Sequence, residues 1–295
     1  MFNLSLIKLV TEAASLEPVK PDSSEFKINT PTSEYFFNQK RIEGDFFYVY
    51  SGHENNAERM DIILKLIKDP QDNDLAQNEI RILQMLHNED VPQLRHLPKL
   101  LDRITDIDSN CLGLILTKFN GYNLNEIRKN PLYLNGVSDQ HMAWILCRLL
   151  SVIGYAHKKG IIHGNIEPAN ILIQPKDHNL CLIDWAYSVY DPAHTSDTFK
   201  IFNQDFSAPE IVDKKILLQS ADLYSVGKCM VYLLGGDLKT NILPESVDPR
   251  IRSFLAFFLL PSPLQRAQDA WHLLKTIEKW RTEIWGEHQF QEFLF

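Results

Sequence analysis

The feature that most constrains the fold is a change of sequence pattern at Gly121, about two fifths of the way along the chain. Before Gly121, runs rich in aromatic and β-branched residues predominate, and a single helical periodicity covers residues 72–86. After Gly121, apolar residues recur every third or fourth position over long windows, and only short strand-like runs interrupt them. A strand-rich part followed by a larger helical part predicts an α+β fold with two lobes.

The first part predicts a small sheet with one helix. The strands are expected over residues 35–50, as a pair joined by a turn at Gly44-Asp45, and over residues 61–67 and 112–119. Prolines and serines between residues 16 and 34 predict a linker or loosely held tail. The predicted division is therefore a tail over residues 1–34, a small lobe over 35–119 and a large lobe over 120–295.

The second part predicts a mainly helical lobe. Ser138 is a suitable N-cap for a helix over residues 139–157. Two short strands are expected over residues 169–173 and 180–183, and further helices over 220–234 and 271–284. Apolar residues continue to the end of the chain, and we favour packing on the large lobe over docking of a partner protein. They are Leu273, Leu274, Ile277, Trp280, Ile284, Phe290, Phe293, Leu294 and Phe295.

Composition narrows the partners and the compartment. The 295 residues carry 30 basic and 38 acidic side chains, a net charge of −8, which argues against a nucleic-acid-binding surface. The longest strongly apolar stretch, residues 254–260, is too short to cross a membrane. The four cysteines have no metal-ligand spacing, which favours a reducing, cytoplasmic setting. Composition therefore predicts that the chain binds neither nucleic acid nor a membrane.

One polar segment is suited to holding a metal ion beside phosphate. It runs from His163 to Asn170, between two apolar runs, and a strand-like run ends at Asp184, 14 residues after Asn170. The amide oxygen and the carboxylate can converge, and such oxygen ligands suit Mg²⁺. Asparagine and aspartate at strand ends are also common turn residues.

Several motifs occur in the order found in protein kinases, and together they resemble that family over residues 35–280. The motifs are Ile62-Ile63-Leu64-Lys65 for V-A-I-K, Glu79 for the helix glutamate, residues 163–170 for H-R-D-L-K-P-x-N, Asp184-Trp185-Ala186 for D-F-G, Ala208-Pro209-Glu210 for A-P-E, residues 222–227 for D-x-W-S-x-G, and Arg266 for the arginine that pairs with the A-P-E glutamate. The resemblance implies a bilobal Ser/Thr-kinase-like fold.

The resemblance also implies a binding site for ATP and Mg²⁺. Lys65, held by Glu79, would neutralise the α- and β-phosphates, while Asn170 and Asp184 would hold the metal. Asp222 would hydrogen-bond the backbone of the catalytic loop. The other implied nucleotide contacts are Gly44, Val49, Ile63, Thr117, Phe119 and Leu172.

Several residues that depart from the family pattern stand at positions that take part in phosphate transfer in protein kinases. Asn165 replaces the catalytic aspartate, and its neutral amide cannot accept a proton; losing a general base typically slows a reaction by about 10²–10⁴-fold. Glu167 replaces the lysine that faces the γ-phosphate. Of the three glycine positions only Gly44 is retained, while Ile42 and Phe47 hold the other two. Ile63 replaces a small alanine, and its bulk works against adenine binding.

These departures predict a pseudokinase, a kinase-like domain that regulates or scaffolds other proteins, with binding of Mg-ATP weighed evenly against a closed pocket. The first alternative is a divergent, slow Ser/Thr protein kinase. A small-molecule kinase of the aminoglycoside or choline type ranks third, because such enzymes do not usually carry the motifs found at Glu210, Asp222 and Arg266.

Overall fold

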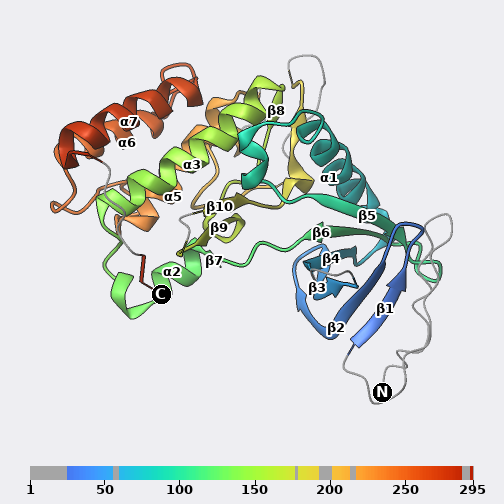
Figure 1. Ribbon diagram of the computed structural model, residues 1–295. Coiled ribbons are helices and arrows are strands. Elements are labelled where there is room, and N and C mark those ends of the chain that lie inside the picture. The colour runs from blue at the N-terminus through green and yellow to red at the C-terminus, as the bar shows by residue number, and fades with distance from the viewer. Residues whose placement is uncertain are drawn as a thin grey trace. The chain divides into compact units, whose positions relative to one another are not determined.

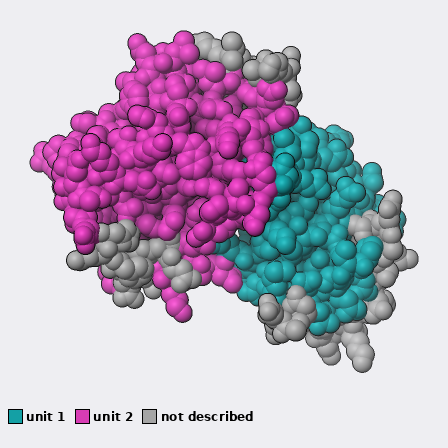
Figure 2. Space-filling model, turned by 45° about the horizontal axis from the view of Figure 1, so that its top comes forward, with its two compact units in different colours: residues 1–88, 98–119 teal, residues 89–97, 120–295 magenta. Residues whose placement is uncertain are grey.

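The computed structural model describes residues 25–55, 60–176, 179–192, 201–212, 217–287 and 293–294. The chain divides into two compact units, residues 1–88 with 98–119, and residues 89–97 with 120–295 (Figures 1 and 2). The first unit is built on a β-sheet with one long helix, and the second is mainly helical. The predicted α+β class, with a strand-rich part before a helical part, is confirmed.

Six antiparallel strands form the sheet of the first unit. Their order is β1 (Glu25–Asn29), β2 (Glu34–Glu43), β3 (Phe47–Glu54), β4 (Asp61–Ile67), β6 (Leu112–Thr117) and β5 (Leu100–Thr105). Helix α1 (Asn73–Leu86) follows the short 3₁₀ turn η1 (Pro70–Asp72) and contacts β5 and β6. Its apolar residues recur at helical spacing and form a buried face against the sheet.

Two strands of this sheet were not expected from the sequence. Strand β1 lies within the predicted tail, where Phe26 and Ile28 alternate with polar residues and the strand pairs with β2. Strand β5 carries Asp102 and Arg103 at its centre, which weakens its apolar pattern. The predicted tail is therefore wrong from Glu25 onward, because pairing with β2 orders this segment; residues 1–24 lie outside the described residues.

The sheet of the first unit is strongly curved. Strands β1 and β5 stand at opposite ends of the strand order. Even so, the turn between β1 and β2 reaches β5, because the Thr32 hydroxyl donates to the Asp102 carboxylate over 2.6 Å. This contact places the β1–β2 turn beside the outer edge of β5.

The second unit is organised around helix α3 (Asp139–Lys158). As predicted, the Ser138 side chain caps it and accepts from the His141 backbone N–H over 3.2 Å. The other helices are α2 (Leu124–Lys129), α4 (Pro209–Val212), α5 (Ser220–Leu233), α6 (Pro249–Phe258) and α7 (Ala270–Trp285), with 3₁₀ turns η2 (Pro92–His96), η3 (Pro131–Tyr133), η4 (Pro168–Asn170) and η5 (Trp185–Tyr187). Two small sheets complete it, β10 (Asn179–Leu182) with β9 (Ile171–Gln174) and β7 (Tyr122–Asn123), and β11 (Val189–Tyr190) with β8 (Ile161–Ile162).

Helix α7 lies against α3 (Figure 1). A glycine in α3 makes this close approach possible, since a Cβ atom at Gly154 would lie 2.9 Å from the indole of Trp271. The end of the chain also packs on this unit. Phe293 is only 2% exposed and stacks on Tyr133 at 4.9 Å between ring centroids, and the Tyr133 hydroxyl donates to the Leu294 carbonyl over 2.9 Å. Packing of the C-terminal apolar residues on the large lobe is thus confirmed for Phe293.

Within the described residues, none of the helices has both the length and the hydropathy that a membrane span requires.

Candidate functional site

Lys65 and Glu79 form a buried ion pair in the first unit. Lys65 lies on β4 and Glu79 on the buried face of α1, and the ammonium donates to the carboxylate over 2.6 Å. Neither side chain is accessible to bulk water to any large extent. The pairing predicted for these two residues is confirmed, and it ties α1 to the sheet.

An aromatic ring covers the Lys65 ammonium. Residues Val49 and Lys65 are direct partners in the β3–β4 register, so Phe47, two positions before Val49, projects from the same face of the sheet. The Phe47 ring centroid lies 4.3 Å from Lys65 Nζ, within the range of a cation–π contact, and the ring is 6% exposed. Ile63 lies on this face as well, since it is two residues before Lys65. The sequence showed Phe47 at a glycine position, but only the strand register shows that it covers the lysine.

The hairpin between β2 and β3 is closed by a turn at Gly44. The Gly44 backbone N–H donates to the Phe47 carbonyl over 2.9 Å, while Ile42, at another glycine position, is 71% exposed. At the end of β6, the Thr117 hydroxyl accepts from the Lys99 N–H, and Phe119 is half-buried. Gly44, Thr117 and Phe119 are thus placed in or beside this sheet, and their contact with nucleotide stays a prediction.

Three polar side chains converge in the second unit. The Asn165 amide donates to the Asp184 carboxylate over 2.7 Å, and the Asn170 amide donates to the Asn165 carbonyl over 2.9 Å. Because an ionised carboxylate only accepts hydrogen bonds, the amide nitrogen of Asn165 must face Asp184. The Asn170 carbonyl also accepts the Ile183 N–H over 3.0 Å, which holds the loop beside the end of β10.

Asp184 has an uncommon backbone conformation, with φ 67° and ψ 61° in the left-handed region. The next residue fixes this turn, since Trp185 is fully buried and its indole N–H donates to the Leu182 carbonyl over 2.9 Å. A non-glycine residue in this region is unusual outside turns and functional sites. Leu172, the predicted nucleotide contact on β9, is half-buried and pairs in register with Cys181.

His163 is held as a neutral imidazole. Its Nδ1 accepts the Asn165 N–H over 3.2 Å, so the ring proton is on Nε2, which donates to the Ile183 carbonyl over 3.1 Å. Complete burial lowers the pKa of this imidazole. The ring also meets the Trp185 indole edge to face, at 4.5 Å between centroids.

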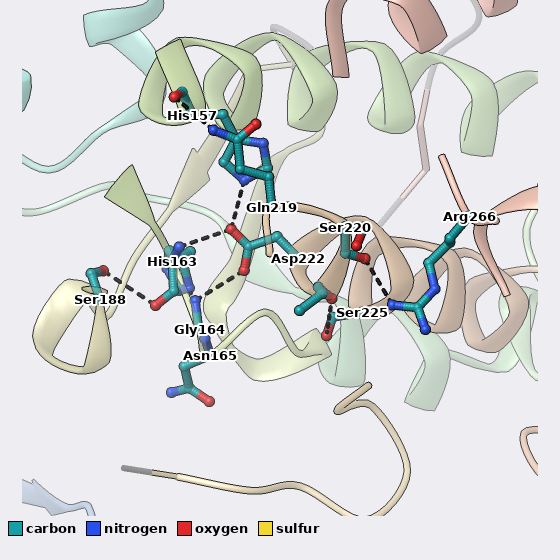
Figure 3. A network of polar contacts seen from close by, with 11 residues as sticks. His157, His163, Gly164, Asn165, Ser188, Gln219, Ser220, Asp222, Ser225 and Arg266 are labelled. Carbon is teal, nitrogen blue, oxygen red and sulfur yellow. Dashed lines mark hydrogen bonds and ion pairs between the residues drawn. The ribbon is translucent and has the colours of Figure 1, made fainter. Parts of the chain in front are cut away.

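Asp222 anchors the loop that carries Asn165 (Figure 3). Its carboxylate accepts the backbone N–H groups of His163 and Gly164 over 2.8 and 2.9 Å, and Nε2 of His157 over 2.9 Å. Burial alone would raise the pKa of the Asp222 carboxyl, but the hydrogen bond from His157 and its neighbours hold the pKa below its ordinary value. The predicted bond from Asp222 to the loop backbone is confirmed. The contribution of His157 was missed, because a histidine at the end of a helix carries no signal of its partner.

Glu167 points to a second loop. The Asn203 amide donates to the Glu167 carboxylate over 2.5 Å, and Asn203 also organises the turn that follows it. Asn203 lies in an irregular stretch and no sequence pattern singled it out. Glu167 thus fixes the segment before Ala208-Pro209-Glu210.

Glu210 and Arg266 form a buried, bidentate ion pair. The two guanidinium nitrogens donate to the two carboxylate oxygens over 2.7 and 3.0 Å. Arg266 also donates to the carbonyls of Ser220, Leu260 and Pro261. The ion pair predicted from the motifs is confirmed, and it joins α4 to the start of α5 and to the loop after α6.

Of the two implied cofactors, Mg²⁺ fits the residues present better than ATP does. The carboxylate of Asp184 and the amide of Asn170 are the oxygen donors that Mg²⁺ takes, although Asp184 is engaged by Asn165. The Lys65 ammonium is covered by Phe47, so a phosphate could pair with it only after this ring moves away, whereas its ion pair with Glu79 is the arrangement in which kinases use this lysine.

Comparison with known proteins agrees with this geometry. Residues 38–282 match the protein kinase domain family. A curated relative, a probable serine/threonine-protein kinase of Dictyostelium discoideum, is 27% identical over 190 residues. That alignment covers 64% of this chain and 29% of the relative, so the chain spans less than a third of that protein. Because the family match covers most of its length, the chain belongs to the protein kinase family.

Proposed function

We propose that this chain is a pseudokinase, a protein kinase domain that regulates or scaffolds another protein and does not transfer phosphate at a useful rate. The observation that carries the proposal is the 2.7 Å hydrogen bond from the Asn165 amide to Asp184. At the position where a kinase needs a proton acceptor, this chain has an amide that donates a hydrogen bond and cannot accept a proton. Loss of a general base typically slows a reaction by about 10²–10⁴-fold.

Two further contacts support the proposal. The carboxylate of Glu167 stands where transfer needs a cation to stabilise the developing negative charge, and it is bonded to Asn203 instead. Phe47 covers the Lys65 ammonium. Each of the charged groups that would address phosphate therefore has a partner within the protein.

A slow, divergent Ser/Thr protein kinase is the second candidate. The Lys65–Glu79 ion pair and the proximity of Asn170 to Asp184 favour it, since positioning and Mg²⁺ supply much of the catalysis of phosphoryl transfer. The relative in Dictyostelium is named a probable serine/threonine-protein kinase. The cysteines at positions 111, 147, 181 and 229 are free and buried, which supports our proposal of a reducing, cytoplasmic setting.

The deciding experiment measures transfer of radiolabelled γ-phosphate to the chain itself and to generic peptides, with Mg²⁺ and with Mn²⁺. We compare the wild type with Asp184→Ala, which removes the metal-binding carboxylate, and with the double variant Asn165→Asp, Glu167→Lys. The pseudokinase proposal expects the wild type and Asp184→Ala to give the same background signal. Robust transfer by the wild type that Asp184→Ala abolishes would establish the second candidate instead. Equal unfolding midpoints show that the variants are folded.

A further inference from the structure

Phe293, near the end of the chain, occupies an aromatic site on the second unit. Its ring stacks on Tyr133 at 4.9 Å between centroids, with the ring planes inclined at 20°, and it meets the His141 ring edge to face at 4.8 Å. The Tyr133 hydroxyl donates to the Leu294 carbonyl over 2.9 Å. The rings of Tyr133 and His141, from η3 and from the start of α3, form the Phe293 site.

The two rings of the Phe293 site are held by contacts that do not involve the end of the chain. The Tyr133 carbonyl accepts from the Arg128 guanidinium, and it also accepts the Gly136 N–H over 3.0 Å. The Ser138 hydroxyl, which caps α3, is hydrogen-bonded to Nδ1 of His141 over 3.0 Å. Because these contacts lie within η3, α2 and α3, the site should keep its shape when the end of the chain leaves it.

The contacts that Phe293 and Leu294 make define what the site accepts. It takes one aromatic ring, and a backbone carbonyl one residue further on accepts the tyrosine hydroxyl. Every residue supplies a backbone carbonyl, and aromatic rings attract one another in these geometries. A segment of another protein with an aromatic residue at this point can therefore make the same contacts. Phe293 is only 2% exposed, so the site removes the ring almost completely from water.

Large apolar side chains beside the site are left uncovered. Leu132 and Leu134, on either side of Tyr133 in the chain, are 63% and 59% exposed, and Leu294 is 54% exposed. Exposed apolar side chains that gather around a site able to bury a ring are typical of a surface that binds protein. The end of the chain thus covers only part of the apolar surface, and a longer ligand could cover more of it.

We infer that the Phe293 site binds a partner segment in which an aromatic residue is followed by an aliphatic one, and that the end of this chain occupies the site until such a partner displaces it. The aromatic residue replaces Phe293, and flanking apolar residues cover Leu132 and Leu134. A tethered segment competes at an effective concentration of about millimolar, so the partner needs these added contacts. The inference rests on the regulatory half of the proposed function, but it involves no nucleotide, so its test and the phosphotransfer test can fail separately.

The test is fluorescence anisotropy with a labelled, end-blocked peptide that has the sequence of residues 288–295. The full chain with Phe293→Ala, which removes the ring from the site, should bind this peptide saturably. The wild type should reach the same plateau only at peptide concentrations at least about tenfold higher, because the peptide must displace the tethered segment. The matched control Phe257→Ala removes an exposed ring from α6 of the same unit, and it should behave like the wild type.

Further variants assign the binding to the site. In the Phe293→Ala background, Tyr133→Phe keeps the stacking ring but removes the hydroxyl, and it should weaken binding by roughly 2–10-fold. A peptide with alanine in place of Phe293 should bind at least about tenfold more weakly. Equal unfolding midpoints show that the variants are folded.

The contribution of the exposed leucines needs a longer probe. Of two peptides lengthened by Leu-Ala-Leu, one at each end, at least one should bind the wild type more tightly than the first peptide does, and Leu132→Ser, Leu134→Ser should remove that gain. The inference is overturned if the folded Phe293→Ala variant does not bind the peptide, if the wild type binds it equally tightly or not at all, if the alanine peptide binds as well, or if neither longer peptide gains affinity.

Discussion

Replacing Phe47 by leucine should strengthen the binding of Mg-ATP. The Phe47 ring lies 4.3 Å from the Lys65 ammonium, and both side chains are largely buried. A cation–π contact is worth about 0.5 kcal/mol when exposed and about 2 kcal/mol when desolvated. A phosphate that pairs with Lys65 must displace the ring, so this energy opposes binding. Leucine retains most of the apolar burial but has no π face.

The expected gain follows from these numbers. If the variant no longer has to give up a contact worth about 0.5–2 kcal/mol, the Kd for Mg-ATP should be roughly 2–30-fold lower. Phe47→Leu should lower the free energy of unfolding by about 1 kcal/mol through changed packing, in addition to the loss of the cation–π contact. Isothermal titration with ATP, with and without Mg²⁺, measures the change in affinity directly.

The control removes a cation–π contact elsewhere in the same sheet. Phe36 lies 5.8 Å from the Lys27 ammonium, and Phe36→Leu should leave nucleotide affinity unchanged. A Phe47→Leu variant that is folded and binds nucleotide no more tightly than the wild type would refute the reasoning. In that case the ring moves without cost, or nucleotide binding does not involve Lys65.

Three further predictions concern stability. Glu210→Ala or Arg266→Ala should lower the free energy of unfolding by roughly 3–5 kcal/mol, measured by urea denaturation, because a buried charge is left without its partner. The free energy of unfolding should decline below about pH 6.5, because burial lowers the pKa of His163 and the unfolded chain then binds a proton that the folded chain does not. Stability measured over a pH series should fall less steeply toward acid pH in His163→Phe than in the wild type. Gly154→Val should destabilise by about 1–3 kcal/mol through collision with Trp271, and thermal unfolding measures the loss.

For each of these three predictions, a control or a second variant defines the result that would contradict it. Glu89 forms an ion pair with Lys159 at the exposed surface, so Glu89→Ala should change the stability much less than Glu210→Ala does, and equal losses for the two variants would contradict the structural role of Glu210. An acid slope that is unchanged in His163→Phe would assign the pH dependence to other groups, among them His96, whose pKa burial also lowers. A second substitution, Trp271→Ala, should remove the penalty of Gly154→Val; persistence of the full penalty would place its cause in α3 itself.

The regular elements could be predicted because their signals are local. The apolar run of β4, the helical spacing of α1 and the Ser138 cap of α3 each lie within one short window, and their boundaries agree with the structure to within a residue or two. Strand β5 could not be recognised in this way. It is an edge strand, and the charges of Asp102 and Arg103 within it break the apolar pattern on which strand prediction depends.

The site was predictable in its residue types but not in its contacts. Motif order brought Asn165, Asn170 and Asp184 together, and the structure places them side by side. The hydrogen bond from Asn165 to Asp184 could not be predicted, because the two residues lie 19 positions apart in the sequence and the bond depends on which way the amide is oriented. The contact of Phe47 with Lys65 depends on strand register, which a one-residue shift would reverse.

The contacts of the charged groups separate support of the fold from handling of phosphate. Asp222 and Arg266 are satisfied by backbone and side-chain partners, so they stabilise the second unit without any ligand. Lys65 is covered by Phe47, and Asp184 accepts a hydrogen bond from Asn165, so a ligand could reach either charged group only by displacing that neighbour. The contacts of Asp222 and Arg266 stabilise the fold whether or not nucleotide is bound. The contacts of Phe47 with Lys65 and of Asn165 with Asp184 must be broken before a ligand can bind, so they lower its affinity. A chain built in this way keeps its kinase fold in the absence of ATP, because the contacts that stabilise the fold are made within the protein.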